Sequence, residues 1–262
     1  MKIYQKYDNY IFDLDGTVYL GNEIIPGAND TINFLIEQKK NVVFISNKTI
    51  YNVGDYAKIL NKFGIKIAAE QIINATLVIA DFLKSNFPKA KFYAIGEKKF
   101  IESLEKIGLV YTENVDKIEI VIITLDRFLN DKKIQIAKEA ILKGANFFAA
   151  NIDNTCPVEG KKQIIDAGIV IKELESLTKK KLELHFGKPT EFMINYISKF
   201  IEINDKTILI GDRLETDILM GKKMKIDTAW VQTGISYLEK DIKVFQPTYV
   251  LTSIWDILSY EI

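Results

Sequence analysis

The sequence predicts an α/β fold built around a parallel sheet. Strand-like apolar runs alternate along the chain with amphipathic stretches, which is typical of β/α units. Two of the strand-like runs lead into glycine and acidic residues, and open parallel sheets place their ligand cleft at such carboxyl ends. With 262 residues, of which 48% are hydrophobic and 27% charged, the chain is long enough for one large domain or two unequal ones.

The expected elements follow this alternation from the N-terminus onward. A strand over 10–13 comes first, and a helix over 29–40 follows, with Ile32, Leu35 and Ile36 on one face. Further strands are expected over 41–46, 91–95, 118–124, 145–149, 182–186, 207–210 and 228–231, with a short one near Tyr249. Further helices are expected over 52–63, 76–87, 98–107, 131–143, 164–180 and 253–260.

Charge and hydropathy exclude two classes of partner. Thirty-five basic residues balance thirty-five acidic ones, so no net field favours binding to nucleic acid or to an anionic membrane. The longest apolar runs, such as 120–123, are far shorter than the ~20 residues that cross a bilayer. The first residues lack the charged start and apolar run of a secretion signal, so we expect a cytoplasmic location.

The chain has one cysteine and one histidine, which limits other chemistries. Cys156 excludes an internal disulfide and a thiolate metal cage within one chain, and we expect a buried or incidental thiol there rather than a nucleophile. His185 lies in a segment that alternates like a strand, so a packed or surface residue is favoured over a base. A zinc site rich in histidine is excluded.

Asp13 and Asp15 follow the first predicted strand directly and precede a turn at Gly16. Once the chain leaves the strand, both carboxylates can point into one cleft. Two crowded acids suit a divalent cation, or a division of roles in which one is ionised and the other protonated. Asp-Gly-Thr is also ordinary turn chemistry, so this motif does not decide the function alone.

Polar residues end two further strands. Ser46 and Asn47 close a buried-type strand with a hydroxyl and an amide, which together with free backbone N–H groups can hold a phosphoryl group. Lys188 lies between a strand and a helix that starts near Pro189 or Thr190, where it is either a site residue or an exposed loop charge.

A fourth strand, over 207–210, leads through Gly211 to Asp212, and Asp217 follows near the start of a helix. The carboxyl ends of parallel strands share one edge of the sheet, so all four polar strand ends can converge on one cleft. Convergence strengthens each of these otherwise weak signals.

The order of these residues resembles the haloacid dehalogenase superfamily, and all four of its motifs are present. The chain is similar to the subfamily IIA hydrolases with a C2-type cap, which include 4-nitrophenylphosphatases, phosphoglycolate and pyridoxal phosphatases and NagD-like nucleotidases. This closer similarity runs from near residue 8 to about 250 and is carried by Tyr19-Leu20-Gly21, Ile25-Pro26-Gly27-Ala28, Ile95-Gly96-Glu97, Leu125-Asp126-Arg127 and the run 150–160.

The resemblance implies a Rossmann-like parallel-sheet core formed by residues 1–78 and 183–262, with an inserted α/β cap over 79–182. It implies a Mg²⁺-dependent phosphatase that hydrolyses small phosphorylated metabolites, and a homodimer formed through the cap. Because a domain-sized cap would exclude phosphoprotein segments and polymers, small phosphomonoesters are the expected substrates.

The resemblance also assigns roles. Asp13 would attack phosphorus and form an aspartyl phosphate, while Asp15 would protonate the leaving group and later activate water. Ser46, Asn47 and Lys188 would hold the phosphoryl oxygens. Mg²⁺ would be held by Asp13, by the main-chain carbonyl of Asp15 and by Asp212. Asp217 would bind the metal through water or orient Lys188, or else accept backbone N–H groups at a helix start.

Two departures from the subfamily concern the substrate. Lys48 stands where relatives often have asparagine, and we hypothesise that this added cation favours a substrate with a second anionic group. The run 165–168 reads Ile-Asp-Ala-Gly where relatives often read Pro-Gly-Ala-Gly, which indicates a differently shaped loop after Gly160. In the cap, Asn151 and Asp153 are candidate substrate contacts, although Asp153 can also stabilise a turn.

Three other functions compete with the phosphatase. A noncatalytic sugar-phosphate or nucleotide sensor on the same fold would lack a nucleophile or a metal ligand, and none is missing here. A dehalogenase would not need the acid at Asp15. A dinucleotide-dependent oxidoreductase would need G-x-G-x-x-G after its first strand, and that pattern is absent.

Overall fold

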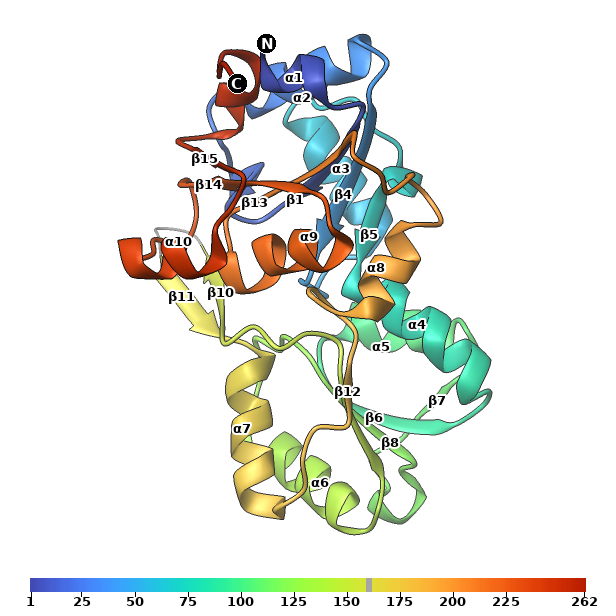
Figure 1. Ribbon diagram of the computed structural model, residues 1–262. Coiled ribbons are helices and arrows are strands. Elements are labelled where there is room, and N and C mark those ends of the chain that lie inside the picture. The colour runs from blue at the N-terminus through green and yellow to red at the C-terminus, as the bar shows by residue number, and fades with distance from the viewer. Residues whose placement is uncertain (159–161) are drawn as a thin grey trace.

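The computed structural model describes residues 1–158 and 162–262. Figure 1 shows two lobes of unequal size, with both chain termini on the larger lobe. A six-stranded sheet forms the centre of the larger lobe and a five-stranded sheet forms the centre of the smaller one. Helices pack against both sheets, so the predicted α/β class is confirmed.

All strands of the larger sheet are parallel, in the order β15-β14-β13-β1-β4-β5. Their bounds are β1 (Asn9–Asp13), β4 (Asn41–Ser46), β5 (Ile72–Asn74), β13 (Thr207–Gly211), β14 (Asp227–Val231) and β15 (Tyr249–Leu251). β1 lies between β13 and β4, with Phe12 level with Ile210 and Asp13 level with Ile45. The polar residues that end these three strands therefore lie side by side at one edge.

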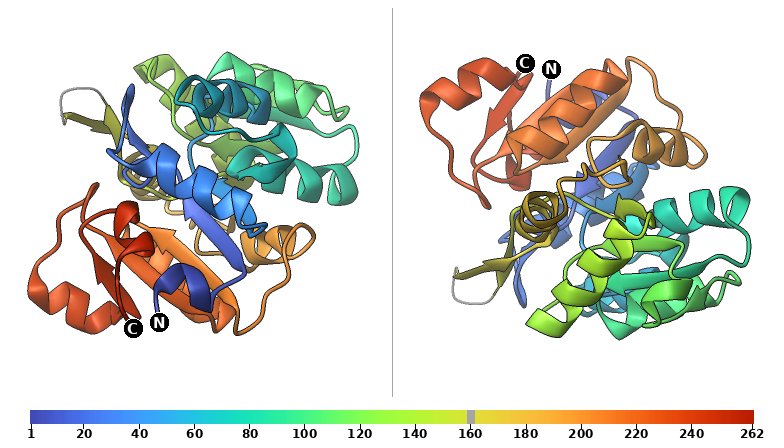
Figure 2. Two further views of the ribbon diagram at one scale, coloured as in Figure 1. Left: turned by 90° about the horizontal axis from the view of Figure 1, so that it is seen from above. Right: turned by 90° about the horizontal axis from the view of Figure 1, so that it is seen from below.

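Helices cover both faces of this sheet, as the views from above and from below show (Figure 2). Phe12 and Phe44 face the side that also buries Leu35 and Leu60. Ile11 faces the other side, together with Val43 and Leu209 of the adjacent strands. Burial on two faces explains why these strands are nearly continuous apolar runs. The helices are α1 (Ile3–Lys6), α2 (Ala28–Glu37), α3 (Val53–Lys62), α8 (Glu191–Ile197), α9 (Leu219–Met224) and α10 (Glu239–Phe245).

The smaller sheet is also parallel, in the order β12-β9-β8-β6-β7. Its strands are β6 (Lys91–Ile95), β7 (Val110–Tyr111), β8 (Ile120–Ile123), β9 (Asn146–Ala149) and β12 (Leu184–His185), and its helices are α4 (Ala75–Asn86), α5 (Lys98–Glu105), α6 (Asp131–Leu142) and α7 (Ala167–Thr178). β12 joins this sheet although it follows the predicted boundary at 182/183, and that division of the chain into core and cap stays a prediction.

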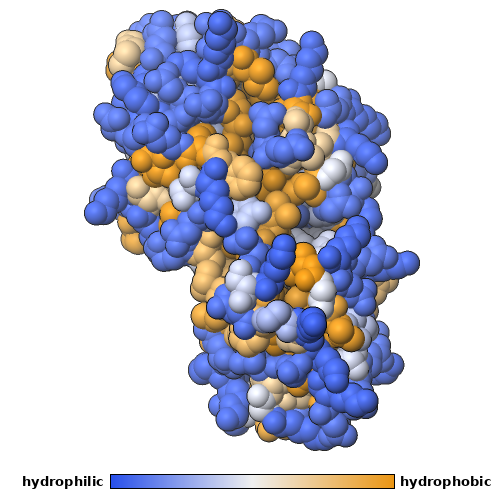
Figure 3. All heavy atoms as spheres, turned by 90° about the vertical axis from the view of Figure 1, so that its right-hand side faces the viewer, coloured by the Kyte–Doolittle hydropathy of each residue, from blue (hydrophilic) through white to orange (hydrophobic). Residues whose placement is uncertain are grey.

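One large hydrophobic cluster contains residues of both lobes. Ile79 and Leu83 of α4 pack in it together with Val43 of the larger sheet and Phe148 of the smaller one. Figure 3 shows the side of the molecule that lies on the right in Figure 1. Hydrophilic side chains cover most of each lobe there, and hydrophobic patches lie along the middle. The two lobes are thus joined by packed side chains, and α4 is the element that connects them.

One predicted helix was wrong at its start. Residues 164 and 165 belong to an antiparallel hairpin of β10 (Thr155–Val158) and β11 (Lys162–Ile165), and α7 begins only after Asp166, whose side chain accepts a hydrogen bond from the N–H of Ala167. A short run of β-branched residues fits a strand or a buried helix equally well, and pairing with Thr155 and Cys156 decides for the strand. Residues 159–161 lie outside the described residues. The run 165–168, which carries the predicted change of loop shape, ends β11 and begins α7, and its difference from relatives stays a prediction.

Several smaller elements were not expected, namely the short hairpin of β2 (Tyr19–Leu20) and β3 (Glu23–Ile24), the strands β5 and β7, and the helices α1 and α10. The last predicted helix is a 3₁₀ segment, Ile254–Leu258. None of the described helices is both long enough and apolar enough to span a bilayer. The cytoplasmic location stays a prediction.

Candidate active site

Asp13 and Asp15 end up in one cleft at the carboxyl end of β1. Asp13 is buried, and its two carboxylate oxygens accept hydrogen bonds from Lys188 Nζ at 2.5 Å and from Thr17 Oγ1 at 3.2 Å. Asp15 accepts from Lys48 Nζ at 2.8 Å and from Tyr19 Oη at 3.1 Å. Each carboxylate thus has a fixed orientation and its own cation.

Gly16 makes the close approach of this loop to Asp212 possible. Its φ of +93° is one that side-chain-bearing residues rarely adopt, and a Cβ there would lie 2.5 Å from Asp212 Oδ2. Glycine therefore permits both the turn after β1 and the contact between the loops that follow β1 and β13.

Lys188 is held between two carboxylates and is only 2% exposed, so the exposed-loop interpretation is wrong. Its Nζ donates to Asp13 and, at 2.7 Å, to Asp217 Oδ1. Burial alone would lower the pKa of Lys188, but Asp13 and Asp217 outweigh burial and raise it above its ordinary value. Lys188 is therefore a permanent buried cation.

Asp13, Asp212 and Asp217 form a buried group in which one oxygen of each lies within 4.8 Å of the others. Asp212 Oδ2 accepts from the N–H of Ile235 at 2.9 Å, whereas Asp212 Oδ1 is buried without a partner among the described residues. Burial, with the neighbouring acids, raises the pKa of Asp212 and raises that of Asp13 to about 7. Such a crowded group of oxygens with an unpartnered member suits a divalent cation.

Asp217 orients Lys188 in this structure, and its other oxygen accepts from the backbone N–H of Arg213 at 3.0 Å. Two of its three expected interactions, with Lys188 and with a backbone N–H group, are therefore present together. A contact of Asp217 with metal stays a prediction.

Ser46 and Asn47 lie on the wall of the same cleft. Ser46 Oγ accepts from the backbone N–H of Lys48 at 3.1 Å. The Asn47 side chain accepts from the N–H of Lys188 at 2.7 Å and donates to the carboxylate of Asp153 at 3.2 and 3.3 Å. Asn47 thus ties the Lys188 loop to the smaller lobe.

Family models match both ends of this chain. A model described as haloacid dehalogenase-like hydrolase matches residues 10–110, and a HAD-hydrolase-like model matches residues 185–257. These two segments contain Asp13, Ser46, Lys188 and Asp212. Lys188 follows β12 of the smaller sheet, so the prediction that all four strands share one edge of a sheet was wrong for Lys188. The chain belongs to the haloacid dehalogenase-like hydrolases.

Curated relatives of this haloacid dehalogenase-like hydrolase are phosphatases, so the predicted phosphatase class is confirmed. Sugar-phosphatase AraL of Bacillus subtilis is 32% identical, with 94% of this chain and 90% of that protein covered. Chloroplastic phosphoglycolate phosphatase 1A of Arabidopsis thaliana is 31% identical, covering 96% and 76%. A solved p-nitrophenyl phosphatase from Archaeoglobus fulgidus has a TM-score of 0.88 at 26% identity, covering 97% and 100%.

Two candidate contacts on the smaller lobe of this hydrolase differ in position. Asp153 lines the cleft beside Lys188, and burial raises its pKa despite the nearby Arg213. Asn151 is fully buried, donates to Asp166 Oδ1 at 3.3 Å and is absent from the described lining of the cleft. Asp166 lines the cleft, whereas Asn151 contacts Asp166 from the buried side. The role of Asn151 as a substrate contact stays a prediction, and this position does not favour it.

Three residues of the site were missed by sequence reasoning. Arg213 Nη2 reaches across to the carbonyl oxygen of Thr155 in the hairpin of the smaller lobe, at 2.9 Å. Tyr19 binds Asp15, and Gly234 lies so close to Asp212 that a Cβ would be 1.9 Å from Oδ2. Arg213 could have been found from the sequence, because it lies between the acidic residues Asp212 and Glu215. The contacts of Tyr19 and Gly234 depend on tertiary structure and could not.

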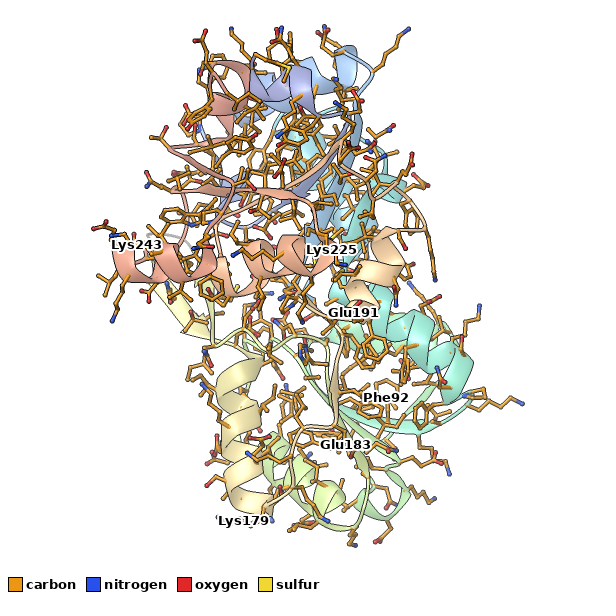
Figure 4. The ribbon with its side chains drawn as sticks, in the orientation of Figure 1. Phe92, Lys179, Glu183, Glu191, Lys225 and Lys243 are labelled. Carbon is orange, nitrogen blue, oxygen red and sulfur yellow. The ribbon has the colours of Figure 1, made fainter. Side chains whose placement is uncertain are left out.

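Cys156 and His185 have the structural roles that were expected. Cys156 is buried beside Ile50 and Leu125, and burial raises the pKa of its thiol to about 12. His185 lies in β12, and burial lowers its pKa, which favours the neutral ring. In Figure 4, Glu191 marks the start of α8 and Phe92 lies in the smaller lobe, with densely packed side chains between them.

Proposed function

We propose that this chain is a Mg²⁺-dependent phosphatase that hydrolyses small phosphomonoesters through an aspartyl phosphate on Asp13. The observation that carries the proposal is the buried group at the end of β1. There Lys188 lies between Asp13 and Asp217. Asp212, one of whose oxygens has no partner among the described residues, belongs to the same group of acids. A fixed ammonium and a crowd of carboxylates can balance the charge of a transferring phosphoryl group.

Asp13 is the proposed nucleophile. One of its oxygens attacks phosphorus in line with the ester oxygen, so that an O–P bond forms to Asp13 and the bond to the leaving group breaks. Hydrogen bonds from Thr17 and Lys188 fix the carboxylate before attack. Water then cleaves the aspartyl phosphate and regenerates Asp13.

Asp15 is the proposed general acid and base. Its carboxyl lies one residue beyond the nucleophile and is oriented by Tyr19 and Lys48. In the bound complex it gives a proton to the leaving oxygen, and in the second step it takes one from the attacking water.

Ser46, Asn47 and Lys188 are the proposed phosphoryl ligands. They come from the ends of β4 and β12 and line the same cleft as Asp13. Their hydroxyl, amide and ammonium groups donate to the equatorial oxygens, whose charge changes during transfer.

The residues present fit Mg²⁺, which prefers oxygen ligands. Asp13, Asp212 and the main-chain carbonyl of Asp15 would hold it, and Asp217 would act through Lys188 or through water. When bound, the ion would neutralise charge on the phosphoryl oxygens. Among the described residues, Asp212 Oδ1 is a buried carboxylate oxygen without a hydrogen-bond partner, and a bound cation would satisfy it.

Small phosphorylated metabolites are the proposed substrates, because the relatives are named as sugar, phosphoglycolate and p-nitrophenyl phosphatases. The smaller lobe would serve as a cap, since its Asp153 and Thr155 contact Asn47 and Arg213 of the larger lobe at the cleft. A cytoplasmic homodimer is part of this proposal. A noncatalytic sensor is not favoured, because Asp13, Asp15, Lys188 and Asp212 are all in place.

We expect phosphate release from 4-nitrophenyl phosphate in Mg²⁺ and its loss in EDTA. Mg²⁺ should also raise the melting temperature of the wild type, because a ligand that binds only the folded state stabilises it. Asp212→Asn should require at least about tenfold more Mg²⁺ for half-maximal activity and lose most of the melting shift. An EDTA-treated enzyme with full activity would contradict the metal requirement, and absence of turnover on a broad panel of phosphomonoesters would contradict the phosphatase.

A further inference from the structure

A second, larger cavity opens beside the catalytic cleft. It has a volume of about 540 Å³ and shares Lys48, Cys156 and Pro157 with the cleft. Residues of both lobes line it, for example Phe63 of the larger lobe and Leu125 of the smaller one. Because it begins where Asp15 meets Lys48, it is the space into which a leaving group bound in the cleft would extend.

The charged side chains that line this cavity are all basic among the described residues. Lys48, Lys62 and Arg127 line it, and no carboxylate does so among the described residues. Arg127 is neutralised by Glu97, to which it donates two hydrogen bonds at 2.6 and 2.8 Å. Lys62 makes no ion pair within the described part of the chain. The cavity wall thus presents more cationic groups than its neighbours neutralise.

Lys48 lies at the junction of cleft and cavity. Its side chain is 13% exposed, and its ammonium makes one hydrogen bond within the described structure, to Asp15 at 2.8 Å. An ammonium carries three N–H donors, so two remain for a ligand. A ligand group that uses them must lie within a few atoms of the ester oxygen, because Asp15 is the group placed to reach that oxygen.

We propose that Lys48 is a specificity-determining residue that selects phosphomonoesters whose leaving group carries a second anionic group close to the ester oxygen. This inference rests on the proposed phosphatase function. The chemistry shared by such substrates is an oxyanion, either a carboxylate or a second phosphate. The aromatic rings of Tyr19, Tyr51 and Phe63 line the same cavity and would contact the remainder of the leaving group.

The test uses matched pairs of substrates in which one member has a second anionic group and the other lacks it. Phosphoglycolate is compared with its amide, and ethylene glycol bisphosphate with the monophosphate, for wild type, Lys48→Met and Lys48→Arg. Lys58→Met is the control, because Lys58 is exposed on the same α3 helix as Lys62 and outside the described cavity linings. The two pairs distinguish a carboxylate from a phosphate as the selected group.

We expect wild type to favour the charged member of at least one pair in kcat/KM, and Lys48→Met to lower that ratio by about tenfold. Lys48→Arg should restore part of the preference, and Lys58→Met should leave it unchanged. Inhibition of the wild type by 3-phosphonopropionate should likewise be stronger than by its amide, which tests binding without turnover.

Two results would overturn the inference: a wild type without preference for either charged member, or an unchanged ratio in Lys48→Met. An unchanged ratio that comes from an equal loss on both members would show that Lys48 acts on Asp15 and the phosphoryl centre. None of these results affects the proposed function, which the EDTA experiment and the broad panel of phosphomonoesters test separately.

Discussion

Replacing Asp13 with asparagine is expected to lower kcat by at least about 10⁴-fold on every phosphomonoester, because the amide cannot form the covalent intermediate. Asparagine has nearly the same shape, and its amide oxygen can still accept from Lys188 while its NH2 group donates to the hydroxyl of Thr17. Lys188 also keeps Asp217 as its counter-ion. The loss should therefore be one of chemistry, measured as phosphate release at saturating substrate and Mg²⁺.

The control for this variant is Asp116→Asn. Asp116 pairs with Lys143 in the smaller lobe, and the side chains of both are more than half exposed. This control should retain wild-type kcat. A melting transition of Asp13→Asn close to that of wild type would show that the variant is folded. Residual turnover above a hundredth of wild type in a folded Asp13→Asn would contradict the role of Asp13.

Replacing Lys188 with methionine is expected to destabilise the protein by about 3–5 kcal/mol and to remove most activity. Methionine keeps the length of the side chain but leaves Asp13 and Asp217 buried without their cation. Activity should fall at least about 100-fold, because a phosphoryl ligand is lost together with the group that orients Asp13.

The loss of stability in Lys188→Met should shrink as pH falls. Burial already raises the pKa of Asp13 to about 7 in the wild type, and removal of the ammonium raises it further. The folded variant then binds a proton more tightly than the unfolded chain, so acid stabilises it relative to its own state at high pH. Urea unfolding at about pH 8 and about pH 5 measures the difference.

Lys199→Met is the matched control for this charge removal. Lys199 pairs with Asp81, and the side chains of both are about half exposed, at 53% and 54%. The control should lose less than about 1 kcal/mol at either pH. Equal losses in Lys188→Met and Lys199→Met would show that the buried pairing contributes no more than an exposed one.

Asp13, Ser46 and Asp212 could be predicted from sequence because each ends or follows a buried strand of one parallel sheet, and such strands end at a common edge. Lys188 was predicted by the same argument, but its strand, β12, belongs to the smaller sheet, so Lys188 reaches the cleft from the other side. The partner of Lys48 could not be predicted, since its contact with Asp15 joins the loops after two different strands. The sequence indicated an extra cation but not that a carboxylate of the site would hold it.

Errors concentrate where the smaller lobe approaches the cleft. The run before α7 was expected to be helical. A short run of apolar, β-branched residues does not distinguish a helix from a strand, and pairing across the hairpin decides for the strand. Asn151 stays a predicted substrate contact, and the fold buries its amide against Asp166. The role of Arg213 was missed because its hydrogen bond to the hairpin is a tertiary contact, between the loop after β13 and Thr155.

The most direct test of the central claim is to trap the phosphoryl group on the enzyme. Wild type is mixed with a rapidly hydrolysed phosphomonoester and Mg²⁺, quenched in acid within one turnover and digested, and the peptide that contains Asp13 is examined by mass spectrometry. The account predicts a phosphoryl adduct on Asp13 that is absent from Asp13→Asn and lost at alkaline pH. Turnover without any adduct on Asp13, or an adduct on another residue, would contradict it.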